Sequence, residues 1–417
     1  MLCAKAKDGR KTGRTTAVQA GAFGYKAGMA LLDPIELARA LIKRPSVTPN
    51  DAGALDLVEA ACRTLGFETR RLRFSAPGQA DVDNLFARRG RSGPVLGYAG
   101  HTDVVPPGQS ASWKHDPFGA VLEDGRLWGR GAADMKGGIA AFLAGVERAI
   151  VENLVTGSLV LLITGDEEGP AVNGTRKMLD WMRENGESLD HCLVGEPTSA
   201  ETLGDMIKVG RRGSLNATLT VRGKQGHVGY PDRARNAVHA LAAIVADLAG
   251  TPLDDGYDRF QPSGLQVTDI HVGNPAGNVI PGEAAARFNV RFNPNWTGRS
   301  LEARLQERVA ALAASHGVAV TLECVVSGES FLTRDDGFIS LVSEAIRGVA
   351  GVTPERSTTG GTSDARFIKD VAPVVEFGLV GATIHQIDEH VVAADIERLA
   401  EIYRAVIARY FARERSA

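Results

Sequence analysis

The sequence lacks any pair of closely spaced cysteines. Its 417 residues contain four cysteines, which are Cys3, Cys62, Cys192 and Cys324. This scatter argues against a disulfide framework and against a structural zinc knuckle, and it fits a protein of the reducing cytoplasm.

Long apolar runs, a strong net charge and one common catalytic motif are missing as well. No run approaches the roughly 20 apolar residues that span a bilayer, so we expect no membrane association. A formal net charge of -3 argues against nucleic acid or anionic lipid as the main partner. No Gly-x-Ser-x-Gly segment occurs, which argues against a serine hydrolase with a nucleophile elbow.

Residues 1–28 are basic, rich in small side chains and without hydrophobic period. They lack the apolar centre of a signal peptide. We interpret them as a disordered N-terminal tail ahead of a natural start at Met29, with a targeting segment as the alternative.

Short apolar runs at 94–100, 159–165, 191–195 and 372–378 are typical of strands buried on both faces of a sheet. One helix is predicted to begin at Asp33-Pro34, a capping acid followed by proline at the first helical position. Further helical patterns occupy 54–65, 137–151 and 174–185. This layout predicts an α/β fold.

The middle of the chain has a different pattern. Residues 214–223 alternate between apolar and polar side chains, as in a strand with one buried face and one solvent-exposed face. A helix at 236–248, strands near 265–272 and 284–292, a helix at 301–316 and a strand at 318–326 follow, in the ferredoxin-like order βαββαβ. Because buried-strand patterns resume afterwards, we expect an inserted domain at 212–326 between catalytic segments 29–211 and 327–417.

Polar residues follow several of the apolar runs, where open α/β sheets bind ligands. They are His101 and Asp103 after the first run, Asp166, Glu167 and Glu168 after the second, Glu196 after the third and His385 after the last, with Asp134 in a glycine-rich turn.

Any one of these residues alone is explained by a solvated loop. Together, two histidines and three carboxylates match two divalent ions, with zinc favoured and cobalt or manganese as alternatives. If one carboxylate bridges, the ions share five ligands. One of the adjacent glutamates can then bind metal while its neighbour acts as general base on a water whose pKa the ions lower to about 7.

From about Leu32 to Phe411 the chain resembles the metal-dependent aminoacylase and carboxypeptidase family. The resemblance lies in GHTDVVPPG, WKHDPFGA, GRGAADMKGG, GDEEGPAVNGT, VGEPTS, VGRRGSL, GKQGHVGYP, GNVIP, GGTSDARF and ATIHQIDE. It implies a mixed-sheet metallopeptidase-like catalytic domain with an inserted ferredoxin-like dimerisation domain. GEPTS, GRRGSL and GGTSD resemble more narrowly the members that cleave N-succinyl-LL-2,6-diaminopimelate in lysine biosynthesis.

The resemblance also implies a role for each site residue. His101, Asp134 and Glu196 would bind one ion, and Asp134 would bridge to a second ion held by Glu168 and His385. Glu167 would be the general base, and Asp103 would orient His101. A cis peptide would join Asp134 to Met135.

The family's inserted domain forms a homodimer and brings a histidine, here His227, to the partner's site to stabilise the oxyanion. The substrate positions of the family correspond to Arg211, Tyr230, Asn278, Arg291, Thr362 and Ser363. Arginines suit a substrate with three carboxylates. For His227 a turn residue is the alternative, for each arginine a surface ion pair, and Arg212 is ambiguous.

Two positions depart from the family pattern: Ala365 stands where glycine is frequent, and Gly381 where asparagine is expected. Neither is a predicted ligand, so they concern the substrate pocket. Two alternative functions stay open. One is the same chemistry on another N-acyl amino acid, such as N-acetylornithine or a peptide, and the other is a metal-binding module without activity.

Overall fold

The computed structural model describes residues 31–274 and 276–413. The predicted tail at 1–28 lies outside these residues. The described residues belong to one compact unit, so the predicted domain boundaries at 211/212 and 326/327 stay predictions. None of the helices in the described ranges has the length and apolar character needed to cross a membrane.

The helices are α1 (Pro34–Ile42), α2 (Ala54–Thr64), α3 (Gly137–Val151), α4 (Thr175–Glu184), α5 (Ala237–Gly250), α6 (Gly298–His316), α7 (Asp336–Ala350), α8 (Ala365–Ile368) and α9 (Ala393–Arg413). The longer strands are β1 (Glu68–Ala76), β2 (Gln79–Arg89), β3 (Val95–His101), β6 (Ser158–Thr164), β7 (His191–Val194), β10 (Gly213–Arg222), β12 (Gly264–His271), β14 (Glu283–Phe292) and β15 (Ala319–Gly328). The shorter strands are β4 (Val121–Glu123), β5 (Arg126–Trp128), β8 (Met206–Lys208), β9 (Gly210–Arg211), β11 (Gly226–His227), β13 (Val279–Ile280), β16 (Phe331–Leu332), β17 (Glu355–Ser357), β18 (Val374–Glu376) and β19 (His390–Val392).

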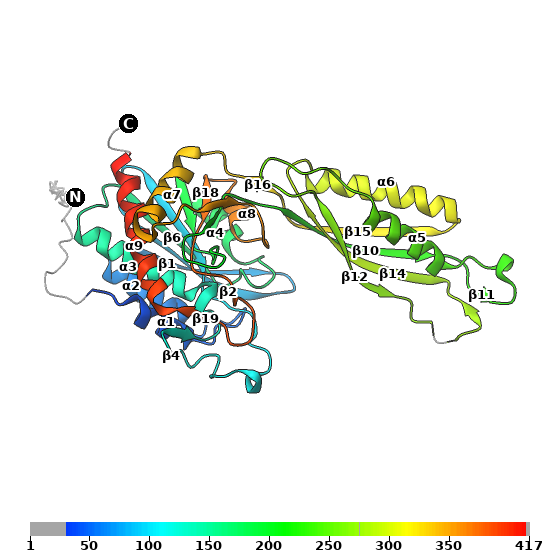
Figure 1. Ribbon diagram of the computed structural model, residues 1–417, viewed down its shortest axis with the longest axis horizontal. Coiled ribbons are helices and arrows are strands. Elements are labelled where there is room, and N and C mark those ends of the chain that lie inside the picture. The colour runs from blue at the N-terminus through cyan, green and yellow to red at the C-terminus, as the bar shows by residue number, and fades with distance from the viewer. Residues whose placement is uncertain (1–30, 275, 414–417) are drawn as a thin grey trace, which may run out of the picture. The chain divides into compact units, whose positions relative to one another are not determined.

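An eight-stranded mixed sheet carries the four predicted buried strands, in the order β1-β2-β6-β3-β7-β18-β8-β17 (Figure 1). The neighbours β6, β3, β7 and β18 run parallel, whereas β2 is antiparallel to β6. Since parallel strands end at one edge, the polar residues that follow them are delivered to the same side of the sheet. The predicted α/β fold with a mixed sheet is confirmed.

Helices cover both faces of this sheet, as the continuous apolar runs predict. On β6, Leu159, Leu161 and Ile163 pack into a core with residues of α1, α3, α7 and α9. Val160 and Leu162 point to the other face, into a core with residues of α4 and α8. Helix α1 begins as predicted, with the Asp33 side chain accepting hydrogen bonds from the backbone N–H groups of residues 35 and 36.

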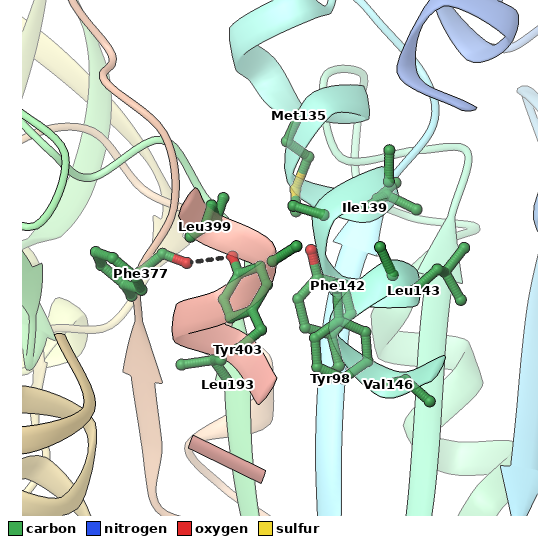
Figure 2. Packing of buried hydrophobic residues seen from close by; sticks show 14 of the residues in the cluster. Tyr98, Met135, Ile139, Phe142, Leu143, Val146, Leu193, Phe377, Leu399 and Tyr403 are labelled. Atoms are coloured by element: carbon green, nitrogen blue, oxygen red, sulfur yellow. Dashed lines mark hydrogen bonds between the residues drawn. The ribbon is translucent and has the colours of Figure 1, made fainter. Parts of the chain in front are cut away.

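An aromatic cluster anchors α9 beside the sheet (Figure 2). Tyr98 of β3 stacks on Phe142 of α3 with ring centroids 3.8 Å apart, and Tyr403 of α9 meets Tyr98 edge-on at 5.9 Å. The Tyr403 hydroxyl donates a 2.7 Å hydrogen bond to the carbonyl of Phe377. These contacts fix the chain directly after β18, which leads into the loop that carries His385.

A second sheet has the order β12-β14-β10-β15, with all neighbours antiparallel. The alternating residues predicted for one face of β10, such as Leu215 and Leu219, are buried against apolar side chains of α5 and α6. Helix α6 ends before Gly317, whose φ of +64° suits glycine. The strands of this sheet and the helices α5 and α6 follow one another in the predicted βαββαβ order (Figure 1). The two-residue strands β11 and β13 pair with each other outside it.

Candidate active site

Two clusters of potential metal ligands lie at the carboxyl edge of the eight-stranded sheet. One contains His101, Asp134 and Glu196, and the other contains Asp134, Glu168 and His385. Within each cluster the potential ligand atoms all lie within 4.8 Å of one another. The structure therefore brings together the five residues predicted as ligands.

Asp134 belongs to both clusters and turns one carboxylate oxygen toward each. Its Oδ1 lies 3.1 Å from Nε2 of His101, and its Oδ2 lies 3.4 Å from Nε2 of His385. His385 Nε2 also lies 3.0 Å from Oε1 of Glu168, and His101 Nε2 lies 3.8 Å from Oε1 of Glu196. This placement suits a bridging carboxylate, and the cis peptide predicted between Asp134 and Met135 is present.

The three consecutive acids after β6 have three different environments. Asp166 is buried and accepts hydrogen bonds from the backbone N–H groups of residues 171, 172 and 173, which closes the loop. Glu168 faces His385. The carboxylate of Glu167 has no hydrogen-bond partner among the described residues and lines a cavity. The two adjacent carboxylates thus have different surroundings: Glu168 lies in a ligand cluster, as a metal ligand would, and Glu167 faces the cavity, as a general base would.

Asp103 holds the site in a way that the sequence did not predict. Nδ1 of His101 lies 2.9 Å from the backbone carbonyl oxygen of Asp103 and 3.6 Å from its carboxylate. The carboxylate instead accepts hydrogen bonds from the Thr48 hydroxyl at 2.7 Å and from the backbone N–H groups of Glu167 and Glu168. Asp103 therefore contacts His101 through its main-chain oxygen and the loop of the two glutamates through its side chain, and its role in orienting His101 stays a prediction.

The electrostatics of the site favour a bound cation. Burial raises the pKa of Glu167, and the nearby charge of Glu196 adds to the increase. Burial and the charge of Asp134 likewise raise the pKa of Glu196. The pKa of His101 is raised although burial opposes it, because carboxylates surround the ring. Carboxylate oxygens and imidazole nitrogens crowded together in this way are a donor set that fits zinc and related divalent ions.

A cavity of about 440 Å³ opens next to both clusters and is lined by Asp134, Glu167, Glu168, Glu196 and His385. A larger cavity of about 950 Å³ lies against α4 and α8, but none of the predicted site residues lines it. The smaller cavity is therefore the candidate active site.

Two of the predicted substrate-binding residues, Arg211 and Thr362, line this cavity. The Arg211 guanidinium is bound bidentately by Glu376, at 2.8 and 2.6 Å, and it also donates to the Gly361 carbonyl. Ser363 is buried and donates its hydroxyl to Glu376 at 2.8 Å, so the structure does not bring this side chain to the cavity wall. Sequence reasoning missed Glu376, although an acid within an apolar strand is a signal for a buried partner.

Lys208 is a further cavity residue that sequence reasoning missed. Its ammonium group donates to the hydroxyls of Ser357 and Thr359, and burial lowers its pKa to about 8. Gly381 also lines the cavity, and a Cβ at this position would lie 2.5 Å from the Pro197 carbonyl oxygen. This backbone path therefore leaves no room for the asparagine expected there.

The remaining predicted residues belong to the segment from β10 to β15 and do not line this cavity. His227 is exposed on β11, and its Nδ1 accepts a 3.0 Å hydrogen bond from the Gly229 N–H. Tyr230 is 60% exposed beside it. Asn278 precedes β13, the partner strand of β11. Arg291 lies at the end of β14, where burial and the charge of Arg212 lower its pKa.

The sequence matches the model of Peptidase family M20/M25/M40 over residues 97–409. It is 57% identical to a succinyl-diaminopimelate desuccinylase of Rhodospirillum centenum over 381 residues, which cover 91% of this chain and 98% of that one. It is 55% identical to a protein of the same name from Methylobacterium radiotolerans, over 90% of this chain and 96% of that one.

A Bacillus subtilis protein, YXEP, described as a dinuclear metal binding peptidase from the M20 family, has the same fold with a TM-score of 0.69. The identity is 17%, and the match covers 91% of this chain and 97% of that chain.

Proposed function

The chain belongs to Peptidase family M20/M25/M40, and from that premise we propose that it hydrolyses N-succinyl-LL-2,6-diaminopimelate to succinate and LL-2,6-diaminopimelate. This is the desuccinylation of diaminopimelate and lysine biosynthesis. The relatives that are 57% and 55% identical carry this activity in their names and match nearly end to end. The observation that carries the proposal is the pair of ligand clusters that share Asp134, beside a Glu167 carboxylate to which no described residue donates a hydrogen bond.

Two divalent ions, zinc in the first place and cobalt as the alternative, are the cofactors of this proposal. His101, Asp134 and Glu196 would hold one ion, and Asp134, Glu168 and His385 would hold the other. When bound, the ions polarise the substrate carbonyl and make a water molecule acidic enough to react near neutral pH.

Glu167 is the general base in this mechanism. Its carboxylate takes a proton from the attacking water, which adds to the amide carbonyl carbon. The same carboxylate then passes the proton to the nitrogen of the leaving amine, so that the C–N bond breaks and Glu167 is regenerated. A carboxylate with no hydrogen-bond partner among the described residues is free to accept and release that proton.

Recognition of the substrate carboxylates is assigned to cationic and polar groups. Arg211 and Thr362 line the cavity, and Ser363 acts through Glu376, which holds the Arg211 guanidinium. We assign Tyr230, Asn278 and Arg291 to the same task in a cytoplasmic homodimer that forms through the inserted domain. His227 of one protomer would then stabilise the oxyanion in the site of its partner.

The test is hydrolysis of N-succinyl-LL-2,6-diaminopimelate by the purified protein, with N-acetylornithine assayed in parallel. Each substrate is measured with the protein as purified, after chelation, and after zinc is added back. Cleavage of the succinyl substrate alone, lost with chelator and regained with zinc, is expected. Cleavage of the acetyl substrate instead would contradict the proposed specificity, and no cleavage of either would point to a metal-binding module without activity.

A further inference from the structure

A buried glutamate outside both ligand clusters connects the two chain segments that carry Asp134 and His385. Glu389 lies four residues after His385 and directly before β19, and it is 0% exposed. It takes no part in the mechanism proposed above. A buried carboxylate is costly unless it is well paired, so its partners indicate what it does.

Four donors bind the Glu389 carboxylate, two at each oxygen. Oε2 accepts hydrogen bonds from Nη1 of Arg130 at 2.7 Å and from the backbone N–H of Gly131 at 3.0 Å. Oε1 accepts from the backbone N–H groups of Ala133 at 2.9 Å and Asp134 at 3.1 Å. Three of the donors are therefore main-chain groups of the single turn that ends at Asp134.

Main-chain contacts extend the connection beyond this side chain. The carbonyl of Glu389 accepts from the Gly129 N–H at 2.9 Å, and the carbonyl of His385 accepts from Nη2 of Arg130 at 3.4 Å. Residues 129–134 and 385–389 are thus joined at both ends. One of these segments supplies the aspartate common to the two clusters, and the other supplies the histidine of the second cluster.

We propose that Glu389 is a positioning residue that sets the direction of the Asp134 carboxylate and the place of His385 by holding these two segments together. The inference rests on the proposed function, because it concerns the same metal-dependent site. A carboxylate offers two acceptor oxygens with about four lone-pair positions, which match four converging donors. A glutamine here would turn an NH₂ group toward N–H donors and would leave the buried Arg130 without its counter-charge.

The experiment compares Glu389→Gln with Glu187→Gln. Glu187 is the control because it also pairs with a buried arginine, Arg88, at 2.6 Å, but it touches neither ligand cluster. Metal-free protein is titrated with Zn²⁺ to obtain affinity and stoichiometry, and the visible absorption spectrum of the Co²⁺-substituted protein reports the ligand geometry. Thermal unfolding of the metal-free variants measures the change in stability separately.

We expect Glu389→Gln to weaken metal binding by about 10–100-fold, as loss of a partner that orients ligands does, and to change the Co²⁺ spectrum. Glu187→Gln should lower the melting temperature while metal affinity and spectrum stay those of the parent protein. Equal affinity and an unchanged spectrum for Glu389→Gln would overturn the proposal, whatever happens to its stability.

If Glu389→Gln does not fold, Glu389→Asp provides the same comparison. It keeps the charge beside Arg130 but is one methylene too short to hold both oxygens against the turn. The same weakening and the same spectral change are expected, and parent-like values would overturn the proposal. Because metal binding is measured without substrate, the outcome is separate from any failure of the desuccinylation assay.

Discussion

The polar side chains at the edge of the eight-stranded sheet and those near β11 are held in opposite ways. The ligand clusters are fixed by contacts within the chain, since Asp103 holds the glutamate loop and Glu389 holds the Asp134 turn. By contrast, the His227 side chain has one hydrogen bond among the described residues, from the nearby Gly229 N–H, and Tyr230 beside it is 60% exposed. The ligand clusters are thus complete within one chain, whereas the role proposed for the residues near β11 requires a second copy of it.

The largest expected effect concerns Glu167, beside the ligand clusters at the edge of the eight-stranded sheet. Glu167→Gln should lower kcat by about 10²–10⁴-fold, because the general base is lost while the volume of the side chain is kept. Both metal ions should remain, since Glu167 belongs to neither ligand cluster. Steady-state hydrolysis and elemental analysis of the same preparation check this result. Turnover close to that of the parent protein would remove Glu167 as the base.

The next effect tests the residues near β11, whose proposed role depends on a second copy of the chain. His227→Ala should lower kcat by about 10²–10³-fold, the range for loss of one oxyanion donor, with metal content and stability unchanged. Mixed dimers of His227→Ala and Glu167→Gln subunits should recover part of the activity, because one of their two sites has both residues intact. Each variant mixed with itself is the control, and no recovery would place His227 outside the partner's site.

A smaller effect separates two arginines that sequence reasoning treated alike. Arg211→Met leaves the buried Glu376 without its cationic partner and should cost about 3–5 kcal/mol of folding free energy, measured by denaturant unfolding. Among residues 31–274 and 276–413, Arg291 forms no ion pair.

Arg291→Met should therefore change the free energy of unfolding by only about 0.5 kcal/mol. It should raise KM about tenfold or more, which corresponds to one charge-assisted hydrogen bond of about 1.5–3 kcal/mol. Unchanged KM with a large loss of stability would give Arg291 a structural role like that of Arg211.

Unbroken apolar runs were sufficient to predict the strands that are buried on both faces. Strands β3 and β6 appear within one residue of their predicted positions, because burial on both faces demands unbroken apolar runs. Strand β1 was not predicted, since its sequence ETRRLRFSA is charged and its side chains are at most half-buried. Its β conformation comes from pairing with β2, which no local pattern encodes.

The residues of the two clusters were predictable as neighbours for a related reason, because each follows an apolar run or lies in a glycine-rich turn. Two buried acids, Glu376 and Glu389, were not predicted, because their contacts depend on partners far away in sequence. Glu376 meets Arg211 across 165 positions, and Glu389 meets Gly131 across 258. A residue type shows what a side chain is able to bind, whereas the fold decides which donors it meets.

The pairing of β7 with β18 has a consequence for the order of events on the ribosome. These neighbouring strands are separated in sequence by the whole segment from β10 to β15, which forms a sheet of its own from contiguous chain. Protein synthesis proceeds at about 5–20 residues per second, so β18 is made on the order of ten seconds or more after β7. The cluster of Asp134, Glu168 and His385 cannot form before the ribosome has added residue 385. The proposed second metal position is therefore completed late in synthesis, after the strands of both sheets have been made.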